Sequence, residues 1–349
     1  MTAAAHPARS AHPTSIRAAF LAAPKQVEVG DFPVPDLAPG QVLVRMLRAS
    51  ICGSDLHVIY DGFHGVLGKP GYPGHEGLGE VRESRSDRFR PGDLVLTVPV
   101  GIDGTCFADH QAVGEEFLVP LPKDGDVDRL LMAQQLGTTI YATRKFWPQT
   151  PGGGTPPGLE RMEPRVATVI GAGSAGLFFL QQVKRLGFEH VIVSDLNQQR
   201  LQVAHELGAD VVADGSGDAV VEATLDCSGG RGADLVIEAA GYDRCREQAI
   251  DAVRPRGRVG CFGYPEVQGL APFPVQKCFR KAPTIEFTVG TQREEGLRSF
   301  RDAVAAIREG AIEVDYCLGA TFPLERAPEA IALAQDRGPA IKVGLDLTR

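Results

Sequence analysis

A glycine-rich turn between an apolar run and a helical run places the strongest constraint on how this chain folds. Residues 165–170 form a continuous apolar strand pattern, and residues 175–186 have helical spacing. The turn between them reads Gly171-Ala-Gly173-Ser174-Ala-Gly176. In this context the first glycine makes the turn, the second lets a pyrophosphate approach the backbone, and the third allows close packing of helix on strand. The turn predicts a dinucleotide site at a helix N-terminus; the alternative is a plain glycine turn that binds nothing.

The pattern around this turn alternates strands with helices. Apolar runs, some of them short, recur at 190–195, 211–213, 233–238, 256–263 and 285–290, and a helical run lies at 198–207. This rhythm predicts a doubly wound parallel sheet, a Rossmann domain, over residues 151–290. The Gly- and Pro-rich stretch 150–158 is the clearest linker before it.

Asp195 ends the strand that follows the glycine turn. A carboxylate there can accept hydrogen bonds from the adenosine ribose hydroxyls and repels a 2′-phosphate, so it favours NAD over NADP. The alternative is a solvated acid at a strand end, with neighbouring Arg200 available to bind a phosphate.

A second constellation lies upstream and carries metal-binding chemistry. Cys52, His75 and Glu76 offer sulfur, nitrogen and oxygen ligands. Three such ligands and one open position are typical of a catalytic zinc site. Each residue alone would more often be structural, but the set precedes a dinucleotide turn, which makes coincidence less probable.

Polar residues directly after Cys52 complete this constellation. Asp55 can hold the far imidazole nitrogen of His75 or cap a short helix, and the two roles are compatible. Ser54 can relay a substrate hydroxyl proton, and His57 can pass it to solvent. The alternative for His57 is an ordinary surface histidine.

The remaining segments predict a β-rich module built from both ends of the chain. Strand patterns occur over 16–28, 41–50, 77–82, 94–98, 117–122 and 340–345; helical patterns occur over 128–145 and 294–308; and 101–116 reads as a loop. The final residues do not continue the strand–helix rhythm. We therefore assign 16–150 and 291–349 to one catalytic domain and 1–15 to a disordered tail.

Charge and composition exclude several classes of partner. Lys and Arg total 36 against 44 Asp and Glu, a net charge of −8 without a basic stripe, so no nucleic-acid partner is expected. No apolar run approaches the length of a membrane span, and residues 1–15 lack the apolar core of a secretory signal. Seven Cys without a C-x-x-C motif indicate reduced thiols and a cytoplasmic location.

Taken together, these motifs resemble the zinc-dependent medium-chain alcohol, polyol and sugar dehydrogenases. The resemblance rests on Cys52-Gly-Ser-Asp-Leu-His57, Gly74-His75-Glu76-Gly77, the glycine turn with Asp195, and the C-terminal Phe322–Ala330 and Ile341-Lys342-Val343 segments. It implies a GroES-like catalytic domain joined to a Rossmann domain, with the site between them. It further implies that Cys52 and His75 bind zinc, with Glu76 a ligand or near neighbour.

The resemblance also assigns roles to residues outside these motifs. Thr139 matches a residue beside the nicotinamide, and Lys342 matches a basic residue near the pyrophosphate. Many relatives carry four closely spaced Cys for a structural zinc, but this chain has only Cys106 in that lobe, so we expect no structural zinc. Gln134 stands where many polyol-type members have Glu. Gln134 either completes a looser zinc shell, or water takes that position beside Cys52, His75 and Glu76. A third possibility is that Gln134 is only a helix residue that lines the cleft.

The predicted function is zinc-dependent oxidation of a secondary alcohol to a ketone, with hydride transfer to NAD. The expected substrate is a small polyhydroxylated compound: a polyol, sugar, aminosugar or cyclitol. By resemblance we expect a homodimer or homotetramer. Two alternatives stay open: a zinc-free NADPH enone or quinone reductase of the same fold, and a dinucleotide-binding protein without catalysis.

Overall fold

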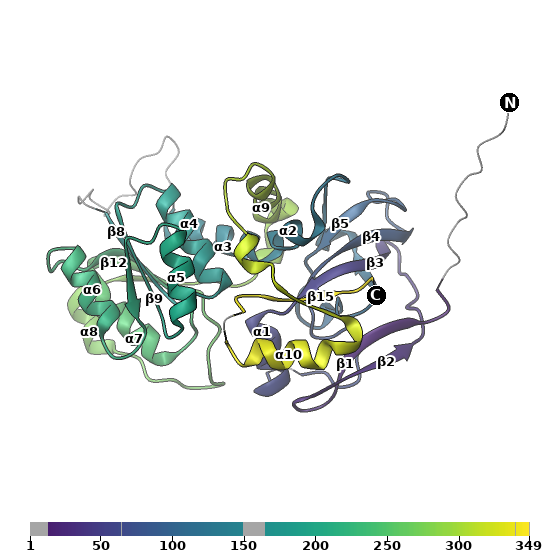
Figure 1. The fold of residues 1–349 in the computed structure, drawn as a ribbon, viewed down its shortest axis with the longest axis horizontal. Helices are drawn as coiled ribbons and strands as arrows, with labels where there is room; N and C mark the ends of the chain where they lie inside the picture. Colours follow the sequence, from purple (N-terminus) through teal and green to yellow (C-terminus); the bar gives the residue numbers. More distant parts are fainter. Residues whose placement is uncertain (1–12, 64, 149–164, 339, 349) are drawn as a thin grey trace.

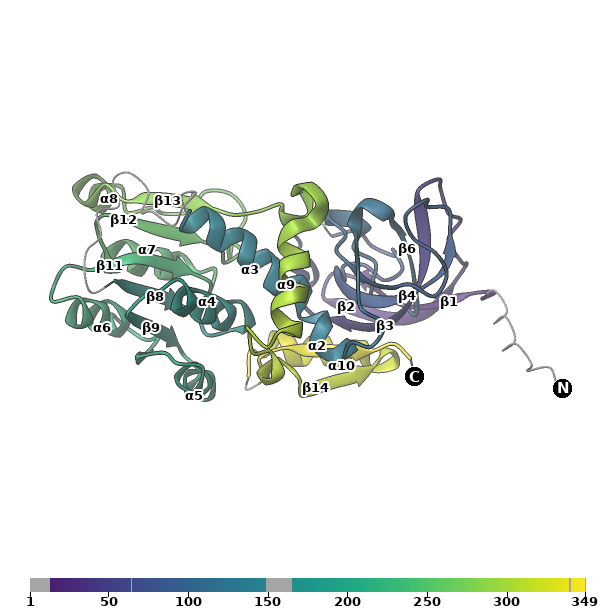
Figure 2. The same ribbon diagram turned by 90° about the horizontal axis from the view of Figure 1, so that it is seen from above.

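The structure is a computed structural model that describes residues 13–63, 65–148, 165–338 and 340–348. Two β-sheet assemblies lie side by side along the long axis of the molecule, with helices α3 (Ala133–Phe146) and α9 (Arg298–Arg308) between them (Figures 1 and 2). The middle of the chain forms one assembly, and the N-terminal and C-terminal parts together form the other (Figure 1).

The first assembly is a six-stranded sheet in which all neighbouring strands are parallel. In spatial order its strands are β10 (Val211–Asp214), β9 (His190–Asp195), β8 (Val166–Ile170), β11 (Ala233–Glu238), β12 (Val253–Cys261) and β13 (Thr284–Phe287). The strand order reverses at β8, so the chain leaves β8 at the switch point where doubly wound sheets bind ligands. The Rossmann-type sheet predicted from the sequence is therefore confirmed.

Alternate residues of the parallel strands face two separate cores, as the strand pleat requires. Val169 of β8 packs in a core with residues of α3 and of α4 (Ser174–Arg185), whereas Val166 and Ile170 of the same strand pack in the other. Further helices of this assembly are α5 (Gln198–Glu206), α6 (Ala219–Cys227), α7 (Asp243–Ala252) and α8 (Val275–Lys281).

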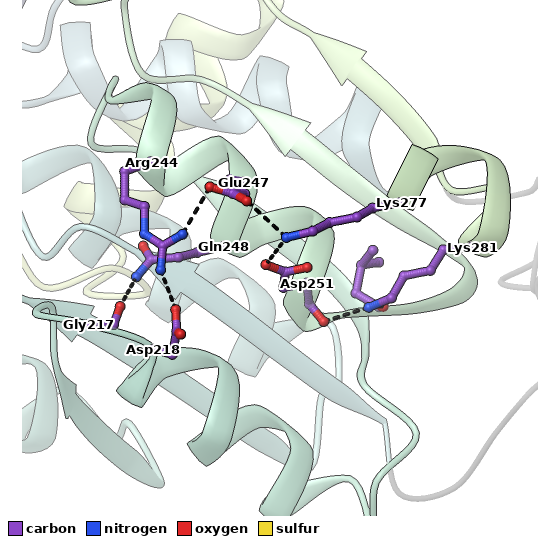
Figure 3. Close-up of polar contacts among 9 residues, drawn as sticks. Gly217, Asp218, Arg244, Glu247, Gln248, Asp251, Lys277 and Lys281 are labelled. Atoms are coloured by element: carbon purple, nitrogen blue, oxygen red, sulfur yellow. Dashed lines mark hydrogen bonds and ion pairs between the residues drawn. The ribbon is translucent and has the colours of Figure 1, made fainter. Parts of the chain in front are cut away.

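A polar network joins α8 to α7 near the β13 edge (Figure 3). Lys277 Nζ lies 2.9 Å from Glu247 Oε1 and 2.8 Å from Asp251 Oδ2. Lys281 Nζ donates to the carbonyl of Asp251 near the end of α7 and to that of Val253 at the start of β12. These contacts fix α8 beside the last strands of the sheet.

The second assembly is a mixed, mainly antiparallel sheet with β3 as its most connected strand. Its main path runs β14 (Ala320–Pro323), β15 (Val343–Asp346), β3 (Gln41–Ser50), β4 (Glu76–Ser84), β5 (Leu94–Thr97) and β7 (Leu118–Pro120), and β6 (His110–Gly114) also pairs with β3. A hairpin of β1 (Ile16–Ala23) and β2 (Gln26–Phe32) adjoins it, and the helices are α1 (Gly53–Tyr60), α2 (Val127–Leu131) and α10 (Ala327–Gln335). Short 3₁₀ turns lie at 101–103, 115–117, 291–293, 295–297, 315–317 and 324–326.

The C-terminal segment returns to the sheet built by the N-terminal part of the chain, as the loss of the strand–helix rhythm predicted. β15 pairs with both β14 and β3, so residues near both ends of the chain share one core. The predicted boundaries of the two domains stay a prediction, because α3 packs against α9 and also against α4 and β12.

Three local expectations were wrong. The segment 101–116 contains β6, whose residues pair with the first half of β3. The helical run 128–145 divides into α2 and α3 around Met132, and α9 begins at Arg298 because Gly296 has a φ of 66°. The linker 150–158 and most of the tail 1–15 lie outside the described residues. Within those residues, the model contains no helix with the length and apolar character of a membrane span.

Candidate active site

The end of β3 and the start of β4 bring three metal-binding side chains together. Cys52 follows β3 and caps α1, while His75 and Glu76 begin β4, which pairs with β3. One ligand atom from each of the three residues lies within 4.8 Å of the other two. Because thiolate, imidazole and carboxylate are the donors zinc prefers, this set fits one zinc ion.

One buried carboxylate orients two of these residues. Asp55 Oδ1 lies 2.7 Å from His75 Nδ1, and Asp55 Oδ2 accepts a hydrogen bond from the Cys52 backbone N–H at 2.9 Å. The contact to Nδ1 leaves Nε2 of His75 for the metal. Burial lowers the pKa of His75, but the charge of Asp55 and hydrogen bonds to Asp55 and Cys52 outweigh it and hold the pKa well above its usual value.

Glu76 is buried beside a lysine from the other end of the chain. Its Oε2 lies 2.6 Å from Lys342 Nζ and accepts a hydrogen bond from Ser50 Oγ at 2.5 Å. Burial raises the pKa of Glu76, but the charges of Lys342 and His75 and these hydrogen bonds bring it below its ordinary value. Burial lowers the pKa of Lys342, and the nearby anions, Glu76 first, raise it above its ordinary value.

This ion pair defines the surroundings of Lys342. The structure places its amine against Glu76, with the two side chains 4% and 1% exposed, and its expected role near the cofactor pyrophosphate stays a prediction. The reason for the pairing is electrostatic, because a carboxylate buried this deeply requires a cation.

Gln134 lies beside the cluster as a buried residue near the start of α3. Its Nε2 donates to the backbone carbonyl of His75 at 3.3 Å. The amide therefore touches the ligand strand, and its role as a zinc ligand stays a prediction.

The predicted proton-relay residues lie on α1. Ser54 Oγ is 3.5 Å from His75 Nε2. His57 is only 9% exposed, and its Nδ1 lies 2.7 Å from Asp61 Oδ2. Its ring packs against Phe63 and against Tyr264, which follows β12 of the other sheet, with ring centroids 5.4 Å apart in both cases. His57 is therefore no ordinary surface histidine, and it lies where the two assemblies meet.

The glycine turn has the geometry that a dinucleotide needs. Gly171 has a φ of 101°, and a Cβ on Gly176 would lie 1.8 Å from the carbonyl oxygen of Gly171. A Cβ on Gly173 would meet no atom within 4 Å, so space for a phosphate remains above the start of α4. Ser174 is the first residue of that helix. These residues fit a bound dinucleotide.

Asp195 and Arg200 are both held by backbone groups. Asp195 accepts hydrogen bonds from the N–H groups of Ala172 and Asn197 at 2.7 and 2.8 Å. Arg200 Nη2 donates to the carbonyls of Gly338 and Ala340, whereas the buried Nε of the same guanidinium has no hydrogen-bond partner among the described residues.

Thr139 is fully buried in α3. Its hydroxyl donates to the Leu136 carbonyl and accepts a hydrogen bond from Gln182 of α4. The structure thus ties this position to α4, the helix that follows the glycine turn.

Sequence reasoning missed four residues of the site: Ser50, Asp61, Phe63 and Tyr264. Asp61 could have been found from its spacing, since it stands four residues after His57 and directly follows the helix that carries this histidine. The only sequence feature that pointed to Ser50 and Phe63 was their position close to the Cys52–His57 motif. No sequence feature pointed to Tyr264, because it follows β12, which belongs to the other sheet.

Comparison with known proteins identifies the family. Residues 175–308 match the family described as "Zinc-binding dehydrogenase", and residues 38–123 match the "Alcohol dehydrogenase GroES-like domain". An L-threonine 3-dehydrogenase of Pyrococcus horikoshii is 30% identical over 258 residues, which cover 68% of this chain and 73% of that protein. The chain belongs to the zinc-type medium-chain dehydrogenases.

Two further comparisons concern a relative by sequence and a protein of the same fold. A sorbitol dehydrogenase of Bacillus subtilis is 28% identical over 269 residues, 72% of this chain and 76% of that protein. The structure of an alcohol dehydrogenase from Thermus sp. ATN1 superposes with a TM-score of 0.79, at 24% identity, over 95% of this chain and 99% of that one. This medium-chain dehydrogenase is an oxidoreductase with a GroES-like domain and a Rossmann-like parallel sheet.

Proposed function

We propose that this dehydrogenase uses zinc and NAD to oxidise a secondary alcohol group of a polyhydroxylated small molecule to a ketone. The observation that carries the proposal is the convergence of Cys52, His75 and Glu76 within 4.8 Å. When bound, zinc would supply a Lewis acid for the alcohol oxygen, and NAD would supply the two-electron oxidant.

The protein prepares this site through its own charges. Asp55 orients His75 and the Cys52 backbone at once. Lys342 and Ser50 both contact Oε2 of Glu76, and these contacts keep the buried carboxylate ionised. Cys52 and His75 are thus the main zinc ligands in our proposal, with Glu76 as a third ligand or close neighbour.

Removal of the alcohol proton falls to Ser54 and His57. Ser54 Oγ lies beside His75 Nε2, so a substrate oxygen held at the metal site would lie close to this hydroxyl. His57 lies one helical turn further along α1 and receives the proton on its way to solvent. Both residues position and move a proton, while the cofactor carries the electrons.

NAD is supported over NADP by the Asp195 carboxylate, which lies at the end of β9. A 2′-phosphate would meet this anion. Arg200 Nη2 is bound to two backbone carbonyls, so this part of the guanidinium does not offset the repulsion. Thr139, joined to α4 through Gln182, is proposed to lie beside the nicotinamide.

The proposed substrate class follows from the relatives and from the polarity of the site. The relatives include sorbitol and L-threonine dehydrogenases, whose named substrates carry a secondary hydroxyl group. In this chain Gln134 and Ser54 provide uncharged polar groups close to His75. We therefore expect polyols, sugars, aminosugars or cyclitols as substrates.

The test is NADH formation with polyols, aldoses, aminosugars, cyclitols and simple secondary alcohols, before and after removal of zinc with a chelator. The same panel is repeated with NADP. We expect turnover with NAD that disappears with the metal and returns on adding zinc. Undiminished turnover in verified zinc-free protein, or reduction of enones with NADPH, would replace this proposal with the metal-free reductase alternative.

We also propose that two copies associate through the β13 edge of the parallel sheet. β13 pairs with β12 on one side, and large apolar side chains around it are exposed: Leu270, Phe279, Phe287 and Val289. Exposed apolar groups along a sheet edge are typical of an interface. The alternative is a tetramer built from such dimers.

A further inference from the structure

Asp61 lies against His57 at the end of the same helix. Its Oδ2 is 2.7 Å from His57 Nδ1, and the Asp61 side chain is 44% exposed while that of His57 is 11% exposed. Phe63 and Tyr264 pack against the imidazole ring. The ring is therefore held by one polar contact and two aromatic contacts.

Helix stability does not explain this carboxylate. Asp61 is the residue that caps the C-terminus of α1, where its backbone N–H donates to the His57 carbonyl. The C-terminus of a helix carries partial negative charge, so an anion there is electrostatically unfavourable. The contact with His57 supplies the compensating interaction.

The contact fixes how His57 presents its two nitrogens. A carboxylate oxygen only accepts hydrogen bonds, so Nδ1 must carry a hydrogen to donate to Asp61. In the neutral ring this leaves Nε2 as the acceptor. Among the described residues Nε2 has no hydrogen-bond partner, which leaves it available to the reaction.

We propose that Asp61 is a positioning residue that holds His57 in the Nδ1–H tautomer and thereby makes Nε2 the proton acceptor of the relay. This inference rests on the proposed function. His57 gains one N–H bond at Nε2 when the alcohol loses its proton, and it later gives that proton to water. No electrons move in this step, and Asp61 keeps its own hydrogen bond throughout.

The first test reads the tautomer directly, without substrate. Protein labelled with ¹⁵N in its histidines is compared by NMR with the Asp61→Ala and Asp61→Asn variants, and His57→Gln assigns the signals. We expect the Nδ1–H form of His57 in the unaltered protein, a mixture of tautomers in Asp61→Ala, and retention in Asp61→Asn, because an amide oxygen still accepts the bond. An Nε2–H form in the unaltered protein, or no change in Asp61→Ala, would overturn the proposal.

A second His–Asp pair provides the matched control. His110 Nδ1 lies 3.0 Å from Asp109 Oδ1 next to β6, outside the candidate site. Asp109→Ala should alter the His110 signals and leave those of His57 and the turnover unchanged. Loss of the His57 tautomer in Asp109→Ala would show a general disturbance instead of a specific contact, and would overturn the assignment to Asp61.

The second test uses the alcohol that the substrate panel identifies. We expect Asp61→Ala to lower kcat by roughly tenfold or more, part of the effect that general base catalysis typically supplies. Zinc content and KM for NAD should stay unchanged, and Asp61→Asn should recover much of the activity. Equal kcat in Asp61→Ala would overturn the proposal. If the unaltered protein oxidises no alcohol, the proposed function fails while the NMR result still decides the tautomer.

Discussion

At the scale of single residues, the candidate site depends on buried charges that neutralise one another. Asp55 is 1% exposed and serves His75, while Glu76 is 1% exposed and depends on Lys342. Each buried carboxylate is therefore paired with one specific basic side chain. Removing one partner of such a pair leaves a buried charge, which costs more than the pair itself contributes.

The first prediction concerns Lys342. Lys342→Met should lower the free energy of unfolding by about 3–5 kcal/mol at neutral pH, because Glu76 then stays buried without a cation. Lys342→Arg should lower the free energy of unfolding by less, since arginine keeps the positive charge beside Glu76. Urea unfolding of the zinc-free proteins measures both values. A Lys342→Met protein as stable as the unaltered one would show that Glu76 does not depend on the amine.

The pH dependence of this difference follows from the directions of the two pKa shifts. The pKa of Glu76 is lowered, so its contribution is present above the ordinary value of 4.5 and is lost as the pH falls through the folded-state value. The pKa of Lys342 is raised, so its contribution is present below the ordinary value of 10.5 and is lost as the pH rises through the folded-state value. The stability difference should therefore be largest between these limits. A difference that stays unchanged in strong acid would contradict the ion pair as its cause.

The second prediction concerns Gln134, which supplies a neutral amide next to His75. Gln134→Glu adds an anionic oxygen ligand and should slow zinc loss to a chelator by roughly tenfold. Gln134→Ala distinguishes the two possible roles of this residue, a zinc ligand or a side chain that only lines the cleft. Zinc retention equal to that of the unaltered protein means that Cys52, His75 and Glu76 suffice, whereas faster loss means that the amide is itself a ligand.

At the scale of elements, two glycines of the same turn have different roles: Gly176 is needed for folding, whereas Gly173 leaves space for a ligand. Gly176→Ala would push a methyl group against the Gly171 carbonyl, which belongs to the same turn. Gly173→Ala meets open space in the protein. The two substitutions add the same group at neighbouring positions, so each is the control for the other.

The third prediction uses this pair. Gly173→Ala should unfold at nearly the temperature of the unaltered protein but bind NAD more weakly, because its methyl group occupies the space proposed for the pyrophosphate. Gly176→Ala should lower the unfolding temperature itself, by several degrees. Thermal scans with and without NAD, and titration of NAD, measure both effects. Unchanged NAD affinity in Gly173→Ala would place the pyrophosphate elsewhere.

At the scale of the whole molecule, the two edges of the parallel sheet differ. The β13 edge carries exposed Phe287 and Val289 at 62% and 87%, whereas Val212 on the β10 edge is 38% exposed. The α7–α8 network lies beside the β13 edge and fixes α8 there (Figure 3). This difference in exposure supports our proposal that a second copy associates through the β13 edge.

The fourth prediction tests this surface. Phe287→Glu combined with Val289→Lys should convert the proposed dimer to monomers, measured by light scattering over a range of protein concentrations. Val212→Glu on the opposite edge is the control and should leave the mass unchanged. A tetramer that becomes a dimer would also support the β13 contact. A mass unaffected by the double substitution would place the interface elsewhere.

The sequence determined those features whose residues lie close together in the chain. The glycine turn predicted the strand, the helix and the switch point after β8, because turn chemistry and apolar periodicity are local. Cys52, Asp55 and His75 were predicted as a set because their residue types match one chemistry, and the structure brings them together.

Only the tertiary structure decided the contacts between segments that are remote in sequence. Lys342 reaches Glu76 because β15 pairs with β3, and Tyr264 meets His57 because the end of β12 faces α1. β6 was missed because its pattern is weak and its pairing with β3 fixes it. The periodicity of a segment shows which face of a helix or strand is apolar. It does not show which distant element will pack on that face. The partners of buried charges depend on this packing, so the sequence alone could not predict them.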